Sequence, residues 1–245
     1  MVPVGILASW QAIASLAHSI YFPPLGTIFA AFGSSWGAAG TASRLVPSLT
    51  RLGIGFTAAA AVGITAGIPL GRSTSMRATV NPVIDFCRAI PAPALLPAAI
   101  VFLGIGNAMK IFVIAFVCLW PVLLNAIDGS RGADQVMVDT ARTYRLPRRT
   151  LLWRIVLPAA APQIFAGLRT SMSIGLIMVI ISEMVASTNG LGHFVLISEQ
   201  TFAIPQMWSG IIVLGLLGYV LNMLLLAVQR RSLRWRTTER PGGGT

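Results

Sequence analysis

The chain has 245 residues, of which 55% are hydrophobic and only 10% are charged, and its formal net charge at pH 7 is +11. A soluble domain normally carries about 25% charged residues, so this composition indicates a membrane protein with several spans. The positive charge does not indicate a nucleic-acid-binding domain, because the arginines lie between and after apolar segments.

The first 43 residues contain no Asp, Glu, Lys or Arg, and a first membrane span is expected at residues 3–21. The sequence Phe22-Pro23-Pro24 then breaks the helix. Residues 1–49 are therefore assigned to this span and an extracytoplasmic segment that follows it. A cleaved signal peptide is the alternative, but such peptides begin with a positively charged segment, which residues 1–4 lack.

Further apolar runs are long enough for a helical crossing, which takes roughly 20 residues. They predict spans at residues 52–71, 86–103, 111–127, 167–187 and 207–228. The expected fold is thus all-α and integral to the membrane, with about six transmembrane helices. Residues 50–229 form the core, and residues 230–245 form a basic tail that is expected to be disordered at its end.

The basic residues predict the orientation of these spans. Fifteen of the 18 fall in the loops after the second and fourth spans, at their edges, or in the tail. Only Arg44, Arg51 and Lys110 fall on the other side. Because cytoplasmic loops carry the excess of Lys and Arg, both termini are expected in the cytoplasm. No internal repeat is visible, so an inverted-repeat carrier has no direct support.

Residues 134–158 form a polar, Arg-rich interruption between the fourth and fifth spans. Asp134 is suited to cap a helix over residues 135–144, and Leu146-Pro147 should end it. A second helix is expected at residues 147–157, ending at Pro158. The segment fits a helix–turn–helix along the cytoplasmic membrane face, and a solvated basic loop that only fixes topology is the alternative.

No catalytic or metal site is predicted. Lys110 is the only lysine and lies outside any phosphate-binding loop, so the chain has no route of its own to ATP hydrolysis. The sequence also lacks the Gly-x-Ser-x-Gly and His-Glu-x-x-His patterns. Cys87 and Cys118 stand alone in apolar surroundings, which excludes a disulfide framework or a thiolate metal site.

The polar interruption resembles the cytoplasmic signature of the membrane subunits of binding-protein-dependent ABC importers with the type I, methionine-importer-like fold. That signature is Glu-Ala-Ala, three residues, Gly, nine residues and Ile-x-Leu-Pro. Here the same spacing joins Asp139-Thr140-Ala141, Arg145 and Ile155-Val156-Leu157-Pro158. Further segments resemble the nitrate, sulfonate and taurine branch: Arg88-Ala89-Ile90-Pro91, Phe102-Leu103-Gly104-Ile105-Gly106 and Ser182-Glu183-Met184-Val185-Ala186-Ser187.

The resemblance implies that the region at about residues 131–160 couples the permease to a separate ATPase. The residues carried over to this role are Asp139, Thr140, Ala141, Arg142, Arg145, Ile155, Leu157 and Pro158. Arg145 departs from the family's glycine. A left-handed conformation would cost it about 1 kcal/mol, unless the turn differs and Leu146-Pro147 supplies the break.

Glu183 is the main candidate for the translocation pathway or its gate. It follows Arg169 by fourteen residues, or about 21 Å of helix, which places it beyond the middle of the membrane. An intramembrane carboxylate indicates function by default, and a packing contact that never touches substrate is the alternative. Met184, Trp120 and Pro91 are weaker pathway candidates. Asp85 and Arg88 are expected to pair on one helix face.

The function implied by the resemblance is that of a permease subunit in an ATP-driven importer of the prokaryotic plasma membrane. Its expected partners are an ABC ATPase dimer, which binds ATP and Mg, a second permease copy, an extracytoplasmic solute-binding protein docking near residues 188–205, and the lipid bilayer. The chain itself should hold no cofactor or metal and bind no nucleic acid. The cargo would be a small organic molecule or oxyanion, such as a sulfonate, taurine, nitrate, a pyrimidine precursor or a related aromatic. A channel or ion-driven carrier, or a membrane-embedded enzyme or scaffold, is the alternative.

Overall fold

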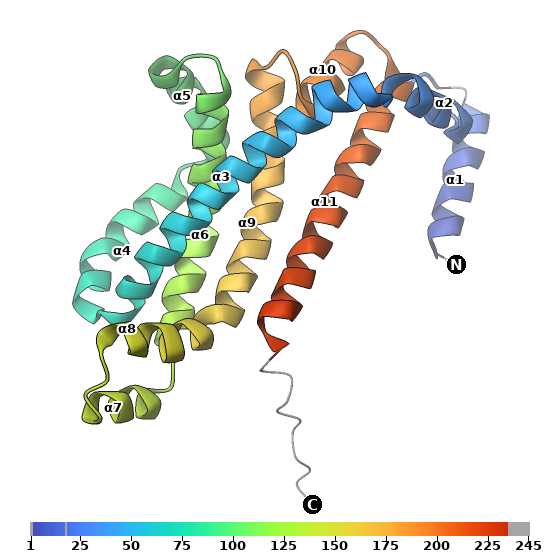
Figure 1. Cartoon of the computed structure of the whole chain (residues 1–245). Helices are drawn as coiled ribbons and strands as arrows, with labels where there is room; N and C mark the ends of the chain where they lie inside the picture. Colours follow the sequence, from blue (N-terminus) through green and yellow to red (C-terminus); the bar gives the residue numbers. More distant parts are fainter. Residues whose placement is uncertain (1, 18, 235–245) are drawn as a thin grey trace, which may run out of the picture.

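A computed structural model describes residues 2–17 and 19–234, and the regular elements in these ranges are all helical (Figure 1). Met1, residue 18 and the predicted tail beyond residue 234 lie outside the described residues. The α-helices are α1 Val2–Ala17, α2 Leu25–Ser35, α3 Ala38–Arg72, α4 Thr74–Ala89, α5 Leu96–Leu103, α6 Asn107–Arg131, α7 Gln135–Thr143, α8 Arg148–Leu151, α9 Leu157–Ala186, α10 Leu191–Gln200 and α11 Ile204–Ser232. Two short turns complete the order, the 3₁₀ turn η1 Ala92–Leu95 and the π-helical turn η2 Leu152–Val156.

Four helical segments are long and apolar enough to cross a membrane: α3, α6, residues 148–186 and α11. They contain the predicted spans at 52–71, 111–127 and 207–228. The predicted span at 167–187 is also contained, apart from residue 187. The predicted first span corresponds to α1, whose 16 residues rise about 24 Å, less than the roughly 30 Å hydrocarbon core. The helix does not continue to residue 21, because the chain turns before Pro23 and Pro24 and resumes as α2.

The predicted span at 86–103 is not one straight helix. The chain runs along α4, breaks at Ile90 and Pro91, and continues from Ala92 to Leu103 at an angle of 86° to α4. Proline disfavours helical backbone at the residue before it, and Ile90 is extended, with φ −70° and ψ 121°. Counted as one broken span, this pair brings to five the segments of the described residues that are long and apolar enough to cross a membrane, against about six predicted spans.

The core of the molecule lies where α3, α6 and α9 pack together (Figure 1). A stripe of small residues on α3 faces α6. A Cβ at Gly63 would lie 2.9 Å from Cγ1 of Val122, and one at Gly67 would lie 2.6 Å from Cβ of Ala126. Such small residues at four-residue spacing let membrane helices approach closely where no hydrophobic effect drives them together. The α3–α6 pair is therefore a tightly packed unit.

Short helices lie at the two ends of this helical layer. Helices α7 and α8 lie at one end, and α2, α5 and α10 lie at the other (Figure 1). The predicted Asp85–Arg88 pair is present, with Arg88 Nε 2.9 Å from Asp85 Oδ1. The end opposite α7 holds the Arg51–Glu183 pair.

Candidate functional site

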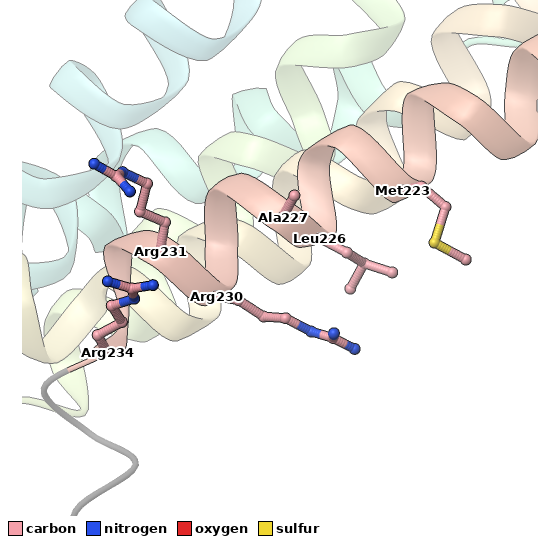
Figure 2. Close-up of a pocket in the computed structure, with 6 residues that line it drawn as sticks. All are labelled: Met223, Leu226, Ala227, Arg230, Arg231 and Arg234. Atoms are coloured by element: carbon pink, nitrogen blue, oxygen red, sulfur yellow. The ribbon is translucent and has the colours of Figure 1, made fainter.

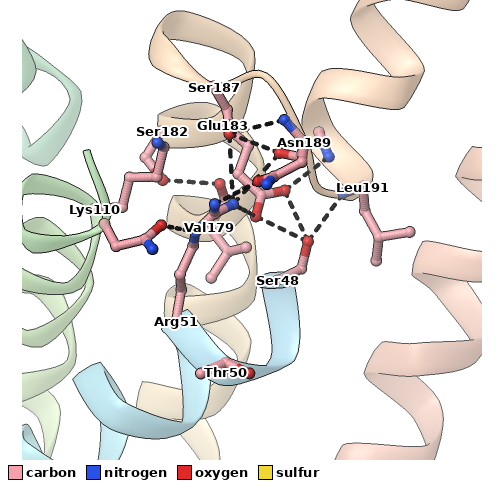
Figure 3. A network of polar contacts seen from close by, with 12 residues as sticks. Ser48, Thr50, Arg51, Lys110, Val179, Ser182, Glu183, Ser187, Asn189 and Leu191 are labelled. Atoms are coloured by element: carbon pink, nitrogen blue, oxygen red, sulfur yellow. Dashed lines mark hydrogen bonds and ion pairs between the residues drawn. The ribbon is translucent and has the colours of Figure 1, made fainter. Parts of the chain in front are cut away.

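A buried ion pair joins α3 to α9 at the end opposite α7 (Figure 3). Nη1 of Arg51 donates to Oε1 of Glu183 across 2.6 Å, and the two residues are 4% and 0% exposed. The sequence prediction singled out Glu183 but treated Arg51 only as a basic residue that fixes topology. A carboxylate inside a membrane protein indicates that a cation lies near it. The sequence does not show which cation, because 132 residues separate Arg51 from Glu183.

The carboxylate of Glu183 is fully engaged by its neighbours. The Ser48 hydroxyl lies 2.8 Å from both carboxylate oxygens, and the Gly192 amide donates to Oε2 at 3.0 Å. Gly190 has a φ of +105° and passes so close to the carboxylate that a side chain there would collide with it. Glu183 thus fastens α9 to α3 and to the start of α10. In this structure it is closed off from any open pathway.

The guanidinium of Arg51 is also held on several sides. Its Nε donates to Oδ1 of Asn107 at 2.9 Å, and Nη2 donates to Oδ1 of Asn189 at 2.6 Å. Arg51 therefore connects α3 to the first residue of α6 and to the loop before α10. Arginine suits such a position because its planar fork can serve several acceptors at once.

The other predicted pathway residues take no part in the hydrogen bonds of this network. Met184 is half-buried beside Glu183, whereas Pro91 is exposed at the break between α4 and η1. Trp120 lines a separate cavity of about 360 Å³ with Arg88. Its Nε1 is buried and has no hydrogen-bond partner among the described residues. None of the described residues around this cavity takes part in the hydrogen bonds of Glu183.

The predicted coupling segment has the expected helix–turn–helix form. The side chain of Asp134 accepts a hydrogen bond from the amide of Val136 at 2.8 Å, as a helix cap does. Helix α7 then ends in a Schellman motif, in which Leu146 N donates to Ala141 O and Arg145 N donates to Arg142 O, each at 2.9 Å. Arg145 has a φ of 53° and adopts the left-handed conformation that glycine would take at less cost.

The exposed and buried faces of α7 are distinct. Asp139, Thr140 and Arg142 are exposed, and Asp139 pairs with Arg142 at 3.2 Å. Ala141 is buried within the chain together with Val138, one turn earlier. The small side chain of Ala141 therefore faces the chain itself, and the exposed side of α7 is formed by other residues, including Val136, Met137 and Tyr144.

The sequence predicted that the second helix of the segment ends at Pro158. In the structure it continues past this residue. It starts at Arg148 and continues through the π-helical turn η2 into α9, so that Pro158 lies in the first turn of α9. A proline lacks the N–H that an α-helix needs, and a π turn just before it absorbs the mismatch. Ile155, Leu157 and Pro158 are half-buried, and Leu157 packs against the buried cluster around Ala126 and Ala160.

Substituting Arg145 by glycine is expected to stabilise the turn by about 1 kcal/mol, because glycine adopts positive φ without steric cost. The unfolding temperature of the purified protein should rise. The matched control is Arg148→Gly, where the same change falls in the first residue of α8 and should lower that temperature instead. A lower unfolding temperature for Arg145→Gly would contradict a Schellman turn at this position.

A cavity of about 380 Å³ lies at the end of α11 and carries three arginines (Figure 2). Its lining comes from α11 and the chain just after it: Met223, Leu226, Ala227, Arg230, Arg231 and Arg234. Because no second element closes it, we assign it no binding role. Across the described ranges, no three or more His, Cys, Asp or Glu residues are grouped to hold a metal ion.

Comparison with known proteins identifies a family that this chain matches. Residues 59–237 match the family described as binding-protein-dependent transport system inner membrane component. The taurine transport system permease protein TauC of Escherichia coli (strain K12) is 30% identical over 94% of this chain and 86% of its own length. The bicarbonate transport system permease protein CmpB of Synechococcus elongatus is 34% identical over 78% of this chain and 69% of its own. Other relatives are named as permeases for aliphatic sulfonates and nitrate.

The fold has solved counterparts as well. An inward-facing crystal structure of the methionine ABC transporter MetNI aligns with a TM-score of 0.62, over 80% of this chain and 99% of the matched chain. Sequence identity in that alignment is 16%, so the likeness concerns the fold alone.

Proposed function

The chain belongs to the family of binding-protein-dependent transport system inner membrane components, and from this premise we propose that its cargo is a small oxyanion or an organic molecule bearing an oxyanion group. The family identifies the chain as the permease subunit of an ABC importer, a transport component without enzyme activity of its own. The proposal therefore concerns what is carried and how the subunit is coupled.

The cargo class is supported by the names of the relatives and by the charges of this chain. Taurine, aliphatic sulfonates, nitrate and bicarbonate are the substrates in those names, and each has an oxyanion group. Arg51 and Lys110 both line a cavity of about 540 Å³ at the end of the helical layer that lies opposite α7. Among the described residues, Glu183 is the one carboxylate that contacts Arg51, so this region favours an anion over a cation.

The proposed assembly is a homodimer of this chain with two copies of a cytoplasmic ATPase and an external solute-binding protein, in which both chain termini are cytoplasmic. The family implies the ATPase and the binding protein. Exposed apolar residues on α7 support an ATPase docking face there, because an exposed apolar patch on a soluble surface marks an interaction site. The most apolar stretch of α11 has no buried residue, which suits contact with lipid or a second copy.

In this assembly α7 and its turn transmit closure of the ATPase pair to the membrane helices. Asp139, Thr140 and Arg142 lie on the exposed side of α7, and Arg145 shapes the turn. Leu157, packed against the core, links the segment to α9. Glu183 acts in the gate by fastening α9 to α3 in the closed arrangement.

The test is reconstitution of the permease with its cognate ATPase and solute-binding protein in lipid vesicles. ATP hydrolysis should be stimulated when the binding protein is loaded with taurine, an alkanesulfonate, nitrate or bicarbonate, and the same compound should accumulate inside the vesicles only with ATP. Stimulation by neutral or cationic solutes alone would contradict the cargo class. Uptake that needs no ATPase would contradict the assembly.

A further inference from the structure

Lys110 is a buried cation that lacks a counter-charge of its own. It lies in the first turn of α6 and is 3% exposed. Its ammonium group has three hydrogens to donate, yet among the described residues it makes a single, long hydrogen bond of 3.4 Å to the carbonyl of Gly106. None of the ion pairs among the described residues includes it.

The neighbouring charges do not neutralise Lys110. Glu183 is the only carboxylate of the network, and its ion pair is with Arg51 at 2.6 Å. Its oxygens also accept from Ser48 and from the amide of Gly192. The cluster therefore holds two cations and one anion, and a buried charge without a partner is strongly unfavourable.

Helix stability does not account for a lysine at this position. The first turn of a helix is the positive end of its dipole, where a cation is repelled. Moreover, α6 begins without a side-chain cap, so its first amide groups are unsatisfied by side chains. A helix N-terminus of this kind attracts anions, and the lysine strengthens that attraction.

The same residues line one cavity. The cavity of about 540 Å³ is bounded by the start of α6, with Gly106, Asn107 and Lys110, and by the loop at Ser187, Thr188 and Asn189. The side-chain oxygen of Asn107 is committed to Arg51 at 2.9 Å. Its amide nitrogen has no acceptor among the described residues, so its two hydrogens are free to donate into the cavity.

We propose that this cavity binds a small oxyanion, held by Lys110, the amide group of Asn107 and the N-terminal backbone amides of α6. The inference rests on the proposed function and deepens it by giving the permease a binding site of its own, at the end opposite the coupling segment. An oxyanion released by the binding protein is held there by Lys110, whose charge has no ion-pair partner among the described residues. Selection of the cargo is then shared between the binding protein and the permease.

The experiment measures anion binding to the purified permease–ATPase complex, without the binding protein, in lipid nanodiscs. Ethanesulfonate, nitrate, bicarbonate and chloride are titrated separately while the unfolding temperature is recorded, because a ligand that binds the folded state raises it. At least one oxyanion should raise it at concentrations where chloride does not. Lys110→Gln should weaken this binding about tenfold or more, and Lys110→Arg should preserve it.

Asn107→Asp is the second variant. It keeps the oxygen that Arg51 contacts, replaces the donating amide by an acceptor and gives Lys110 an anionic neighbour. The complex should fold normally and lose oxyanion binding by about tenfold or more. Arg77→Gln removes one positive charge from α4, away from the cavity, and should leave the affinity unchanged.

Two results would overturn the site: no oxyanion response in the wild-type complex beyond that of chloride, or an unchanged affinity in Asn107→Asp. These results are distinguishable from failure of the proposed cargo. If the complete transporter still imports an oxyanion with ATP, only the site is wrong. If the complete transporter imports none of these anions, the cargo class is wrong as well.

Discussion

Replacing Arg51 by methionine is expected to destabilise the protein by about 3–5 kcal/mol, because it leaves the Glu183 carboxylate buried without its partner. Arg51 and Glu183 are 4% and 0% exposed, so the lost contact lies inside the protein. The unfolding temperature of the purified permease should fall sharply. Glu183→Gln should also be destabilising, since it leaves the guanidinium without a negative charge.

The double variant Arg51→Met with Glu183→Gln separates pairing from general damage. Removing both charges eliminates the unpaired ion, so the double variant should be more stable than the sum of the two single losses predicts. Arg88→Met is the matched control. Its ion pair with Asp85 has a similar length, 2.9 Å, but both side chains are more than half exposed, and such pairs contribute about 0–1 kcal/mol.

A gate role for Glu183 predicts more than a change in stability. In membranes that retain folded Glu183→Gln protein, uptake driven by loaded binding protein should change, because the latch between α3 and α9 is weakened. If both uptake and the stimulation of ATP hydrolysis match the wild type, Glu183 is only a packing contact.

Replacing Tyr144 by alanine is expected to reduce the stimulation of ATP hydrolysis about tenfold or more. Tyr144 is 77% exposed at the end of α7, and tyrosine is enriched among the residues that carry most of the energy of protein interfaces. The unfolding temperature should be nearly unchanged, because few contacts within the chain are lost. Co-purification of the ATPase with the tagged permease gives a second readout.

Ala141→Trp should act through a different route. Ala141 is buried within the chain, so a bulky side chain displaces α7 and lowers both the unfolding temperature and the stimulation of ATP hydrolysis.

Tyr21→Ala is the control for Tyr144→Ala, because Tyr21 is similarly exposed in the turn between α1 and α2, far from α7 in the chain. Normal ATPase binding and stimulation in Tyr144→Ala would contradict a docking face on this side of α7.

The parts of the fold that follow from local chemistry were predictable from the sequence. Long apolar runs located α3, α6, α9 and α11, and Asp134 with Leu146-Pro147 located both ends of α7. The size of the bend at Pro91 and the continuation of the helix through a π turn and Pro158 were not predicted. Proline shows where a helix is disturbed, but whether the chain bends by 86°, as after α4, or continues, as into α9, depends on the helices packed against it.

The candidate site was predictable only in part, for a related reason. Glu183 was identifiable because an acid within an apolar span needs an explanation. Its partners Arg51 and Ser48 lie on α3, and no local pattern connects residues more than 130 positions apart. In the sequence, Lys110 was interpreted only as a basic residue on the side opposite the cytoplasm. Its burial could not be predicted, because it depends on how α6 packs against the loop before α10.

The distance in sequence between Arg51 and Glu183 also bears on how the protein is made. Arg51 leaves the ribosome 132 residues before Glu183, which at roughly 5–20 residues per second is an interval of about 7–26 s. During that time α3 enters the membrane with an arginine that has no carboxylate to meet it. The 35 residues of α3 rise about 52 Å, well over the bilayer core, so the helix can keep Arg51 near the headgroups until α9 arrives and locks it in place.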